Sequence, residues 1–175
     1  VIDGITFRNG FSEGYGGCML IENSSPVLIN CNFYQGDATV GGGVCLVNSD
    51  ARIQESNISS SRAFLGGGGV AKIQNDRSVI LDVRISNNSS ILEGGGLYCM
   101  SSSNDIAACR ISGNSAKMGG GIYSNNRSSI SLYQCELKNN WAGYGSGGYL
   151  QNSTSSLSDC LIKDNFAYFN GGGLY

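Results

Sequence analysis

Carboxylates are the first candidates for a catalytic or metal-binding role, because the chain contains 13 Asp and Glu residues and no histidine. Without histidine, Ser-His-Asp and Cys-His nucleophile systems and histidine-ligated metals are excluded. Carboxylates alone can act in pairs on a glycosidic bond. Here they scatter over the repeat described below, and the nearest match in position, Asp82 with Asp159, is three repeats apart. We therefore expect no catalytic residues and no metal site.

A glycine-rich segment, residues 143–148 (GYGSGG), formally satisfies the dinucleotide pattern G-x-G-x-x-G. That pattern binds a pyrophosphate only where a helix follows it. No helical periodicity follows this segment, so we interpret it as a corner of the fold and expect no cofactor.

Seven cysteines are the next candidates. Four of them share one repeat position that is otherwise Ile, Ser or Val, and we interpret these four as buried thiols that pack as small apolar side chains. They are Cys31, Cys109, Cys135 and Cys160. A disulfide within the last three is an alternative, because adjacent strands bring their Cα atoms close enough, although the parallel orientation is unfavourable. No Cys-x-x-Cys motif indicates zinc.

Six Asn-x-Ser/Thr sequons offer sites for modification. Five are expected in exposed turns or at outward positions, and they are candidates for N-glycosylation: Asn23, Asn57, Asn87, Asn126 and Asn152. The sixth, Asn88, belongs to an internal asparagine column and is expected to be inaccessible. Glycosylation along one edge would imply secretion by a eukaryotic cell.

Outward aromatic side chains are candidates for surface contacts. Tyr98, Tyr123 and Tyr175 share one repeat position, and Trp141 and Phe166 share another. Such stripes can stack on sugars or pack on another protein. The alternative is that these rings only shield neighbouring repeats.

The elements that position these residues recur about every 26 residues, a length typical of solenoids. The recurring mark is the second glycine of a Gly-Gly pair, and the six intervals between these glycines average 26 residues. The glycines are Gly17, Gly43, Gly69, Gly96, Gly121, Gly148 and Gly173. About half a repeat later, apolar residues stand three positions before and two after the cysteine-bearing position in every repeat. Apolar residues two apart indicate strands, and the glycine content disfavours helices.

This pattern predicts an all-β fold, a right-handed parallel β-helix of about seven rungs with two or three short strands in each. Leucine-rich, helical and propeller repeats do not fit its period and composition. One corner is expected to carry a ladder of asparagines with positive φ and amides stacked along the axis: Asn88, Asn114, Asn140 and Asn165. Residues 1–175 are interpreted as a single segment of a longer chain, uncapped at both ends, where further rungs or neighbouring subunits are expected.

Three units, residues 109–123 (CRISGNSAKMGGGIY), 135–150 (CELKNNWAGYGSGGYL) and 160–175 (CLIKDNFAYFNGGGLY), resemble the polymorphic outer-membrane protein repeat. That family is a Gly-rich β-helix of the pectin-lyase-like superfamily, with paired FxxN and GGA[ILV] motifs. Here Ile or Leu usually replaces Phe, and Gly replaces Ala. The resemblance covers the whole chain. It implies an adhesin-like or surface-structural role and supplies no catalytic residues.

The composition argues against nucleic acid as a partner and against a membrane span. A net charge of −2 gives no electrostatic reason to expect nucleic acid, and no apolar run is long enough to span a membrane. We expect a non-catalytic structural or adhesive scaffold, extracellular or at the cell surface, with glycans or other surface proteins as partners. Two alternatives remain: the scaffold part of a carbohydrate-active enzyme whose site lies outside this segment, and a segment of a fibre or surface appendage.

Overall fold

The computed structural model describes all 175 residues, which form 27 short strands in four parallel sheets. Sheet A contains β1 (Ile2–Asp3), β5 (Val27–Ile29), β9 (Arg52–Gln54), β13 (Val79–Leu81), β17 (Ser103–Ala107), β21 (Ser129–Tyr133) and β25 (Thr154–Ser158). Sheet B contains β2 (Thr6–Arg8), β6 (Asn32–Tyr34), β10 (Asn57–Ser59), β14 (Arg84–Ser86), β18 (Arg110–Ser112), β22 (Glu136–Lys138) and β26 (Leu161–Lys163). Sheet C contains β3 (Phe11–Tyr15), β7 (Asp37–Val40), β11 (Arg62–Gly66), β15 (Ser89–Ser90), β19 (Ser115–Met118), β23 (Trp141–Tyr144) and β27 (Phe166–Asn170). Sheet D contains β4 (Met19–Glu22), β8 (Val44–Val47), β12 (Val70–Ile73), β16 (Leu97–Met100), β20 (Ile122–Asn125) and β24 (Gly148–Leu150).

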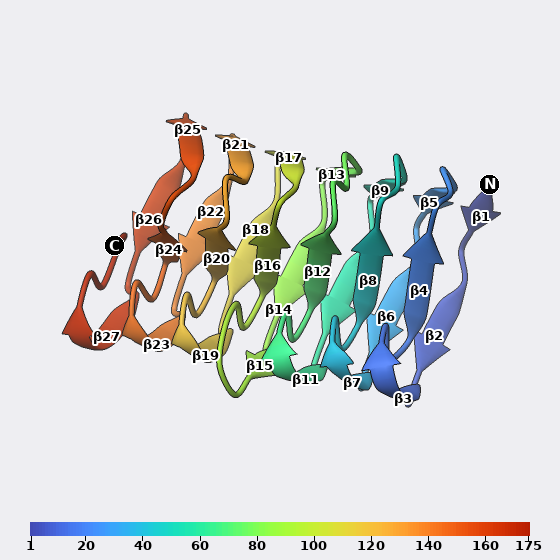
Figure 1. Cartoon of the computed structure of the whole chain (residues 1–175), viewed down its shortest axis with the longest axis horizontal. Coiled ribbons are helices and arrows are strands. Elements are labelled where there is room, and N and C mark those ends of the chain that lie inside the picture. The colour runs from blue at the N-terminus through green and yellow to red at the C-terminus, as the bar shows by residue number, and fades with distance from the viewer.

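Each strand pairs in parallel with its equivalent one turn along the chain, so the molecule is a coil of stacked turns (Figure 1). Turns are numbered here 1 to 7 in chain order. Six turns are complete, and the seventh has no strand in sheet D, so the expectation of about seven rungs is slightly high. Each complete turn has four strands rather than two or three. No helix is present that could cross a membrane.

The extra strands exist because the chain bends at four corners in each turn, and a left-handed residue stands at each corner. The corner between sheets C and D uses glycine, as at Gly41 (φ 68°) and Gly119 (φ 65°). The corner between sheets B and C uses Asn87 (φ 56°) and Asn139 (φ 52°), one residue before the ladder asparagines. The prediction of positive φ in the ladder itself was therefore wrong, because the ladder side chains point inward and the corner side chains point out.

The asparagine ladder is buried and bonds along the axis, as expected. Asn114 accepts a hydrogen bond from the Asn88 backbone N–H (2.9 Å) and donates to Asn140 Oδ1 (3.1 Å) and to the Ile85 carbonyl (3.0 Å). Asn88, Asn114 and Asn140 are at most 1% exposed. Each amide thus satisfies the backbone of a corner that has no other partner.

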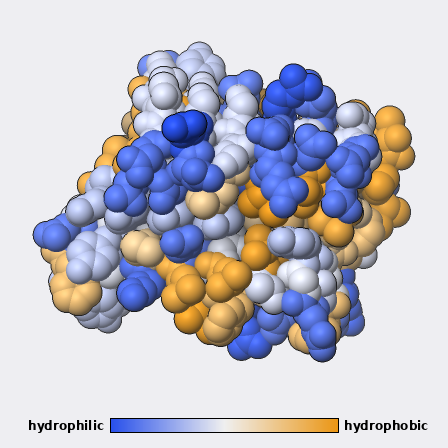
Figure 2. Space-filling model, in the orientation of Figure 1, coloured by the Kyte–Doolittle hydropathy of each residue, from blue (hydrophilic) through white to orange (hydrophobic).

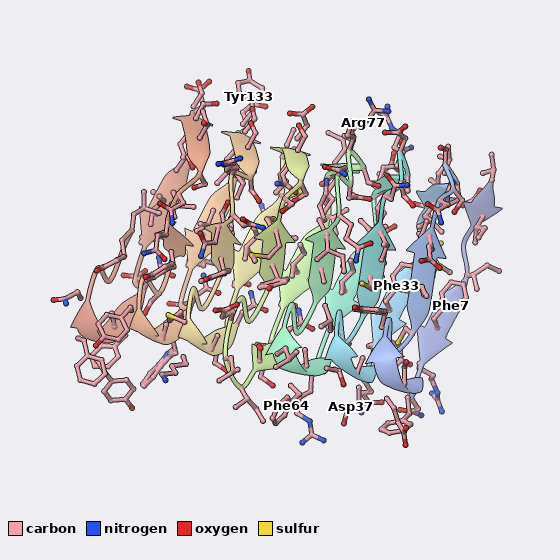
Figure 3. The ribbon with its side chains drawn as sticks, viewed as in Figure 1. Phe7, Phe33, Asp37, Phe64, Arg77 and Tyr133 are labelled. Atoms are coloured by element: carbon pink, nitrogen blue, oxygen red, sulfur yellow. The ribbon has the colours of Figure 1, made fainter.

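The core lies inside the coil and consists of 23 buried apolar residues from the inward columns. Phe7 and Phe33 stack within it at a centroid distance of 5.0 Å (Figure 3). A second cluster of five buried residues lies on the outer face of sheet D and includes Cys45 and Ile73 of that sheet, with Val40 of sheet C beside them. Sheet D is therefore apolar on both faces.

If the turns are aligned on the second glycine of each Gly-Gly pair, the strand pairing in sheet D differs from that alignment in two turns. Met19, not Cys18, pairs with Val44, and Tyr149 pairs with Tyr123. The three corner residues are Gly16, Gly17 and Cys18 in turn 1, and Gly145, Ser146 and Gly147 in turn 6. The marked glycine is therefore the second corner residue in turn 1 and the first residue after the corner in turn 6. In the other five turns the marked glycine is the third corner residue, so the mark is displaced by one residue in turns 1 and 6 only.

Candidate functional site

A polar groove of about 480 Å³ runs along the corner between sheets A and B in turns 3 to 5. We call it the A–B groove. Its charged lining residues are Glu55, Asp82, Arg84 and Arg110. Glu55 and Asp82 are equivalent corner residues in adjacent turns, with φ values of 49° and 50°. The prediction that Asp82 and Asp159 form the nearest pair was therefore wrong: Glu55 shares the column of Asp82 and is only one turn away.

The two arginines stand one above the other on sheet B, where Arg84 pairs with Arg110. Like charges directly opposite each other destabilise a sheet. Arg110 is offset by Glu136 at 3.7 Å, whereas Arg84 has no ion pair. The groove therefore holds two carboxylates and two guanidinium groups that are not neutralised by one another. Such a set can bind a charged sugar, and paired carboxylates can act as acid and base.

The second candidate is the outer side of sheet C, which we call the sheet C face. Of the sixteen large apolar side chains that are exposed, nine lie in or directly beside its strands. They are Phe11, Tyr15, Phe64, Leu65, Ile91, Trp141, Phe166, Tyr168 and Phe169. The face follows the lower edge of the molecule in Figure 1, and Figure 2 shows apolar side chains gathered there over the middle strands. An exposed set of this kind is typical of an interaction surface.

Strand alternation and bulges together expose these apolar side chains. The register of sheet C shifts between Ala63 and Gly66, and turns 3 and 4 each carry one more residue before the glycine corner than turn 2 does. A bulge leaves its extra residue unpaired and re-aims the side chains around it. Phe64 and Ile91, each 56% exposed, directly follow the inward residues Ala63 and Ser90, and Leu65, which is 41% exposed, lies within the register shift.

Trp141 and Phe166, expected as surface contacts, lie on this face with 51% and 48% exposure. Their ring centroids are 5.0 Å apart, and Tyr168 packs against both, at 6.4 Å from Trp141 and 5.2 Å from Phe166. The three rings form one aromatic cluster on turns 6 and 7. Tyr168 was missed in the sequence because the same repeat position holds unlike residues, such as Thr39 and Lys117, in other turns.

The tyrosine stripe differs from its prediction. Tyr98, Tyr123, Tyr149 and Tyr175 stack in one column with centroid distances of 5.6, 5.4 and 4.8 Å. Tyr98 is half-buried because it packs on the apolar outer face of sheet D, and Tyr123 is only 3% exposed because it is stacked between Tyr98 and Tyr149. Tyr123 thus has no ring face to offer a partner, and only Tyr175, at 51%, is exposed.

A buried ion pair was not expected at all. Lys72 and Asp76 are both fully buried, and Lys72 Nζ lies 3.2 Å from Asp76 Oδ1. Lys72 Nζ also donates to the Ser103 carbonyl (3.1 Å) and to the Ser78 carbonyl, and burial lowers the pKa of this lysine. The available signal was a lysine in a sheet D column that is otherwise Ile21, Leu46, Cys99, Ser124 and Leu150.

The loop that carries Asp76 is one residue longer than its counterpart in turn 2, and Asp76 turns inward to reach Lys72. Its carboxylate also accepts hydrogen bonds from the backbone N–H of Ser49 (3.2 Å) and of Ser78 (3.0 Å). The next residue, Arg77, points out and makes a bidentate contact with Asp50 at 2.9 Å. The pair anchors this longer loop and gives no sign of a reaction.

All seven cysteines are free thiols. The predicted cysteine column is inward: Cys31, Cys109 and Cys135 are buried, and Cys160 is half-buried. Cys109 Sγ donates to the Ala107 carbonyl (3.1 Å), and the hydrogen bond with Cys135 together with burial raises the pKa of Cys109. A protonated, enclosed thiol is a poor nucleophile, so Cys109 agrees with the packing interpretation, whereas the same hydrogen bond lowers the pKa of its neighbour Cys135.

The family is decided by the comparison with family models. A model described as "Right handed beta helix region" matches residues 1–175. The chain belongs to the right-handed β-helix family. No curated protein and no solved structure matches it.

Within this right-handed β-helix, the five candidate sequon asparagines are all exposed: Asn23, Asn57, Asn87, Asn126 and Asn152. Asn88 is 1% exposed and belongs to the internal ladder, as expected. Asn57 lines the A–B groove. Glycosylation of the five sites stays a prediction.

Proposed function

We propose that this right-handed β-helix is a non-catalytic extracellular or cell-surface scaffold that adheres to glycosylated surfaces through the sheet C face. The observation that carries the proposal is the aromatic cluster of Trp141, Phe166 and Tyr168, which is exposed on paired strands. Aromatic rings held on a rigid sheet lose little conformational freedom when they bind, and they stack on the apolar faces of sugars.

The sequon positions support an extracellular location. Asn23, Asn126 and Asn152 share one corner, between sheets D and A, and all three are exposed. This corner lies away from the sheet C face, along the upper edge of Figure 1. Glycans on it would leave the adhesive face free.

The test is binding to an immobilised mucin-type glycoprotein, before and after enzymatic removal of its glycans. The Trp141→Ala/Phe166→Ala variant is expected to bind at least about tenfold more weakly, which corresponds to about 1.4 kcal/mol. The matched control, Tyr133→Ala, removes an exposed ring from sheet A and is expected to bind as the wild type does. Equal binding by all three proteins, or binding that ignores glycan removal, would contradict the proposal.

A second candidate function, a carbohydrate-active enzyme, is favoured by one observation: Glu55 and Asp82 line the A–B groove from adjacent turns. The release of reducing ends from polysaccharides measures it. Activity that disappears in Asp82→Asn and survives Trp141→Ala would establish this function in place of adhesion.

A further inference from the structure

The sheet C face has two rows of outward side chains that run along the axis. The first row pairs residue by residue from turn 1 to turn 7: Phe11, Asp37, Arg62, Ser89, Ser115, Trp141 and Phe166. The second row stands two residues further along each strand: Glu13, Thr39, Phe64, Ile91, Lys117, Gly143 and Tyr168. Apolar side chains occupy the middle of the second row and both ends of the first.

This order is self-complementary. A two-fold axis that runs parallel to the strands, midway between turns 3 and 4, brings turn 3 against turn 4, turn 2 against turn 5, and turn 1 against turn 6. Phe64 then meets Ile91 of the second copy, and the reverse contact forms on the other side of the axis. Isologous interfaces require this reciprocity.

Charges match under the same rotation. Asp37 stands diagonally across from Lys117 of the second copy, a distance that a lysine side chain can span. Lys117 is exposed and forms no ion pair within its own chain, whereas Asp37 is 2.6 Å from Arg62. The second copy would therefore supply the missing counter-ion of Lys117.

The aromatic ends also match. Phe11, which is 73% exposed, meets Trp141 of the second copy, which is 51% exposed. The arrangement thus has an apolar centre, charged pairs around it, and aromatic contacts at both ends, which is the usual anatomy of a protein–protein interface.

We infer that the sheet C face also binds a second copy of this chain, packed antiparallel about a two-fold axis between turns 3 and 4. This inference goes beyond the proposed adhesion and does not depend on it; because the dimer covers Trp141, a second copy and a glycan compete for this face. Turns 1 to 6 span about 24 Å at strand spacing, which makes a small contact area. The association is therefore weak in dilute solution and strengthens as the protein concentration rises.

The first experiment is sedimentation equilibrium from 10 µM to 1 mM. The wild type is expected to show a reversible monomer–dimer equilibrium. Ile91→Glu places two carboxylates one turn apart at the axis and is expected to weaken dimerisation at least tenfold. Tyr133→Glu, on the opposite edge of the molecule from Phe64 (Figure 3), is the control and is expected to leave dimerisation unchanged. A wild type that stays monomeric at 1 mM, or an Ile91→Glu variant that dimerises normally, overturns the inference.

The second experiment tests the register by disulfide trapping. A mixture of Phe11→Cys and Trp141→Cys chains is expected to form a cross-linked heterodimer, whereas neither variant alone is, because its two cysteines would lie about 24 Å apart. Equal cross-linking in the single-variant samples, or in a Tyr133→Cys and Trp141→Cys mixture, overturns the proposed axis. Glycoprotein binding is measured separately, so adhesion can stand when self-association fails.

Discussion

Replacing Lys72 by methionine is expected to destabilise the protein far more than the loss of one surface ion pair would. The substitution keeps the volume of the side chain but removes the ammonium group beside a carboxylate that is fully buried. Asp76 keeps its hydrogen bonds from Ser49 and Ser78, yet its charge has no counter-ion, and the Ser103 carbonyl loses its donor. Breaking a buried pair in this way costs about 3–5 kcal/mol.

The double variant Lys72→Met/Asp76→Asn removes both charges and should recover most of this loss. The asparagine oxygen still accepts from the Ser49 or Ser78 backbone, and its amide group can donate to the carbonyl that Lys72 leaves. We expect the double variant to unfold within about 2 kcal/mol of the wild type, because replacing both members of a buried pair is often close to neutral.

The assay is urea unfolding followed by circular dichroism, with the free energy of unfolding extrapolated to water. Lys117→Met is the matched control, since Lys117 is exposed and unpaired, and its effect should stay within about 0.5 kcal/mol. A Lys72→Met variant as stable as the wild type would refute the reasoning. So would a double variant no more stable than the single one.

Three further changes test the ladders and the corners. Asn114→Ala leaves the Asn88 N–H without a partner and removes one donor from the Ile85 carbonyl, so it should cost about 2–5 kcal/mol in urea unfolding, whereas exposed Asn57→Ala should cost under about 1. Gly95→Ala should cost about 3 kcal/mol by the same measurement, because its Cβ would lie 2.6 Å from the Gly120 carbonyl oxygen. Burial raises the pKa of Cys45 to about 12, so its contribution to stability is present below pH 9 and is lost as the pH rises towards 12. In thermal unfolding, the Cys45→Ala variant should therefore lose less stability than the wild type does between pH 9 and 11. Parallel plots of stability against pH for the two proteins would contradict this.

The stacking of turns was predictable from the sequence because each inward column sees the same environment in every turn. Ile80, Ile106 and Leu132 occupy one column, are at most 2% exposed, and pair directly with one another. A parallel ladder places equivalent residues of neighbouring turns next to each other, so one repeat period and two apolar columns are enough to predict the fold. The asparagine ladder followed for the same reason.

Features that break the period could not be predicted in the same way. The inserted residue before Asp76 and the extra residues that follow Ala63 and Ser90 have no equivalent in turn 2, and the directions of the side chains beside them depend on local backbone geometry. The burial of Tyr123 depends on the rings of Tyr98 and Tyr149, which stack on both of its faces outside the coil. By contrast, the pairing of Glu55 with Asp82 was available from the repeat, since both residues directly precede the same column.

The direction of the hydrogen bonds has a mechanical consequence. The backbone forms 120 hydrogen bonds, almost all between neighbouring turns and therefore along the axis of the coil. A tensile load along that axis must rupture the bonds of all four sheets at one interface together, so the rod resists pulling. A load that peels the chain sideways from one end breaks the same bonds a few at a time. A rod anchored at one end would hold firm when stretched and unravel when its free strand is pulled across it.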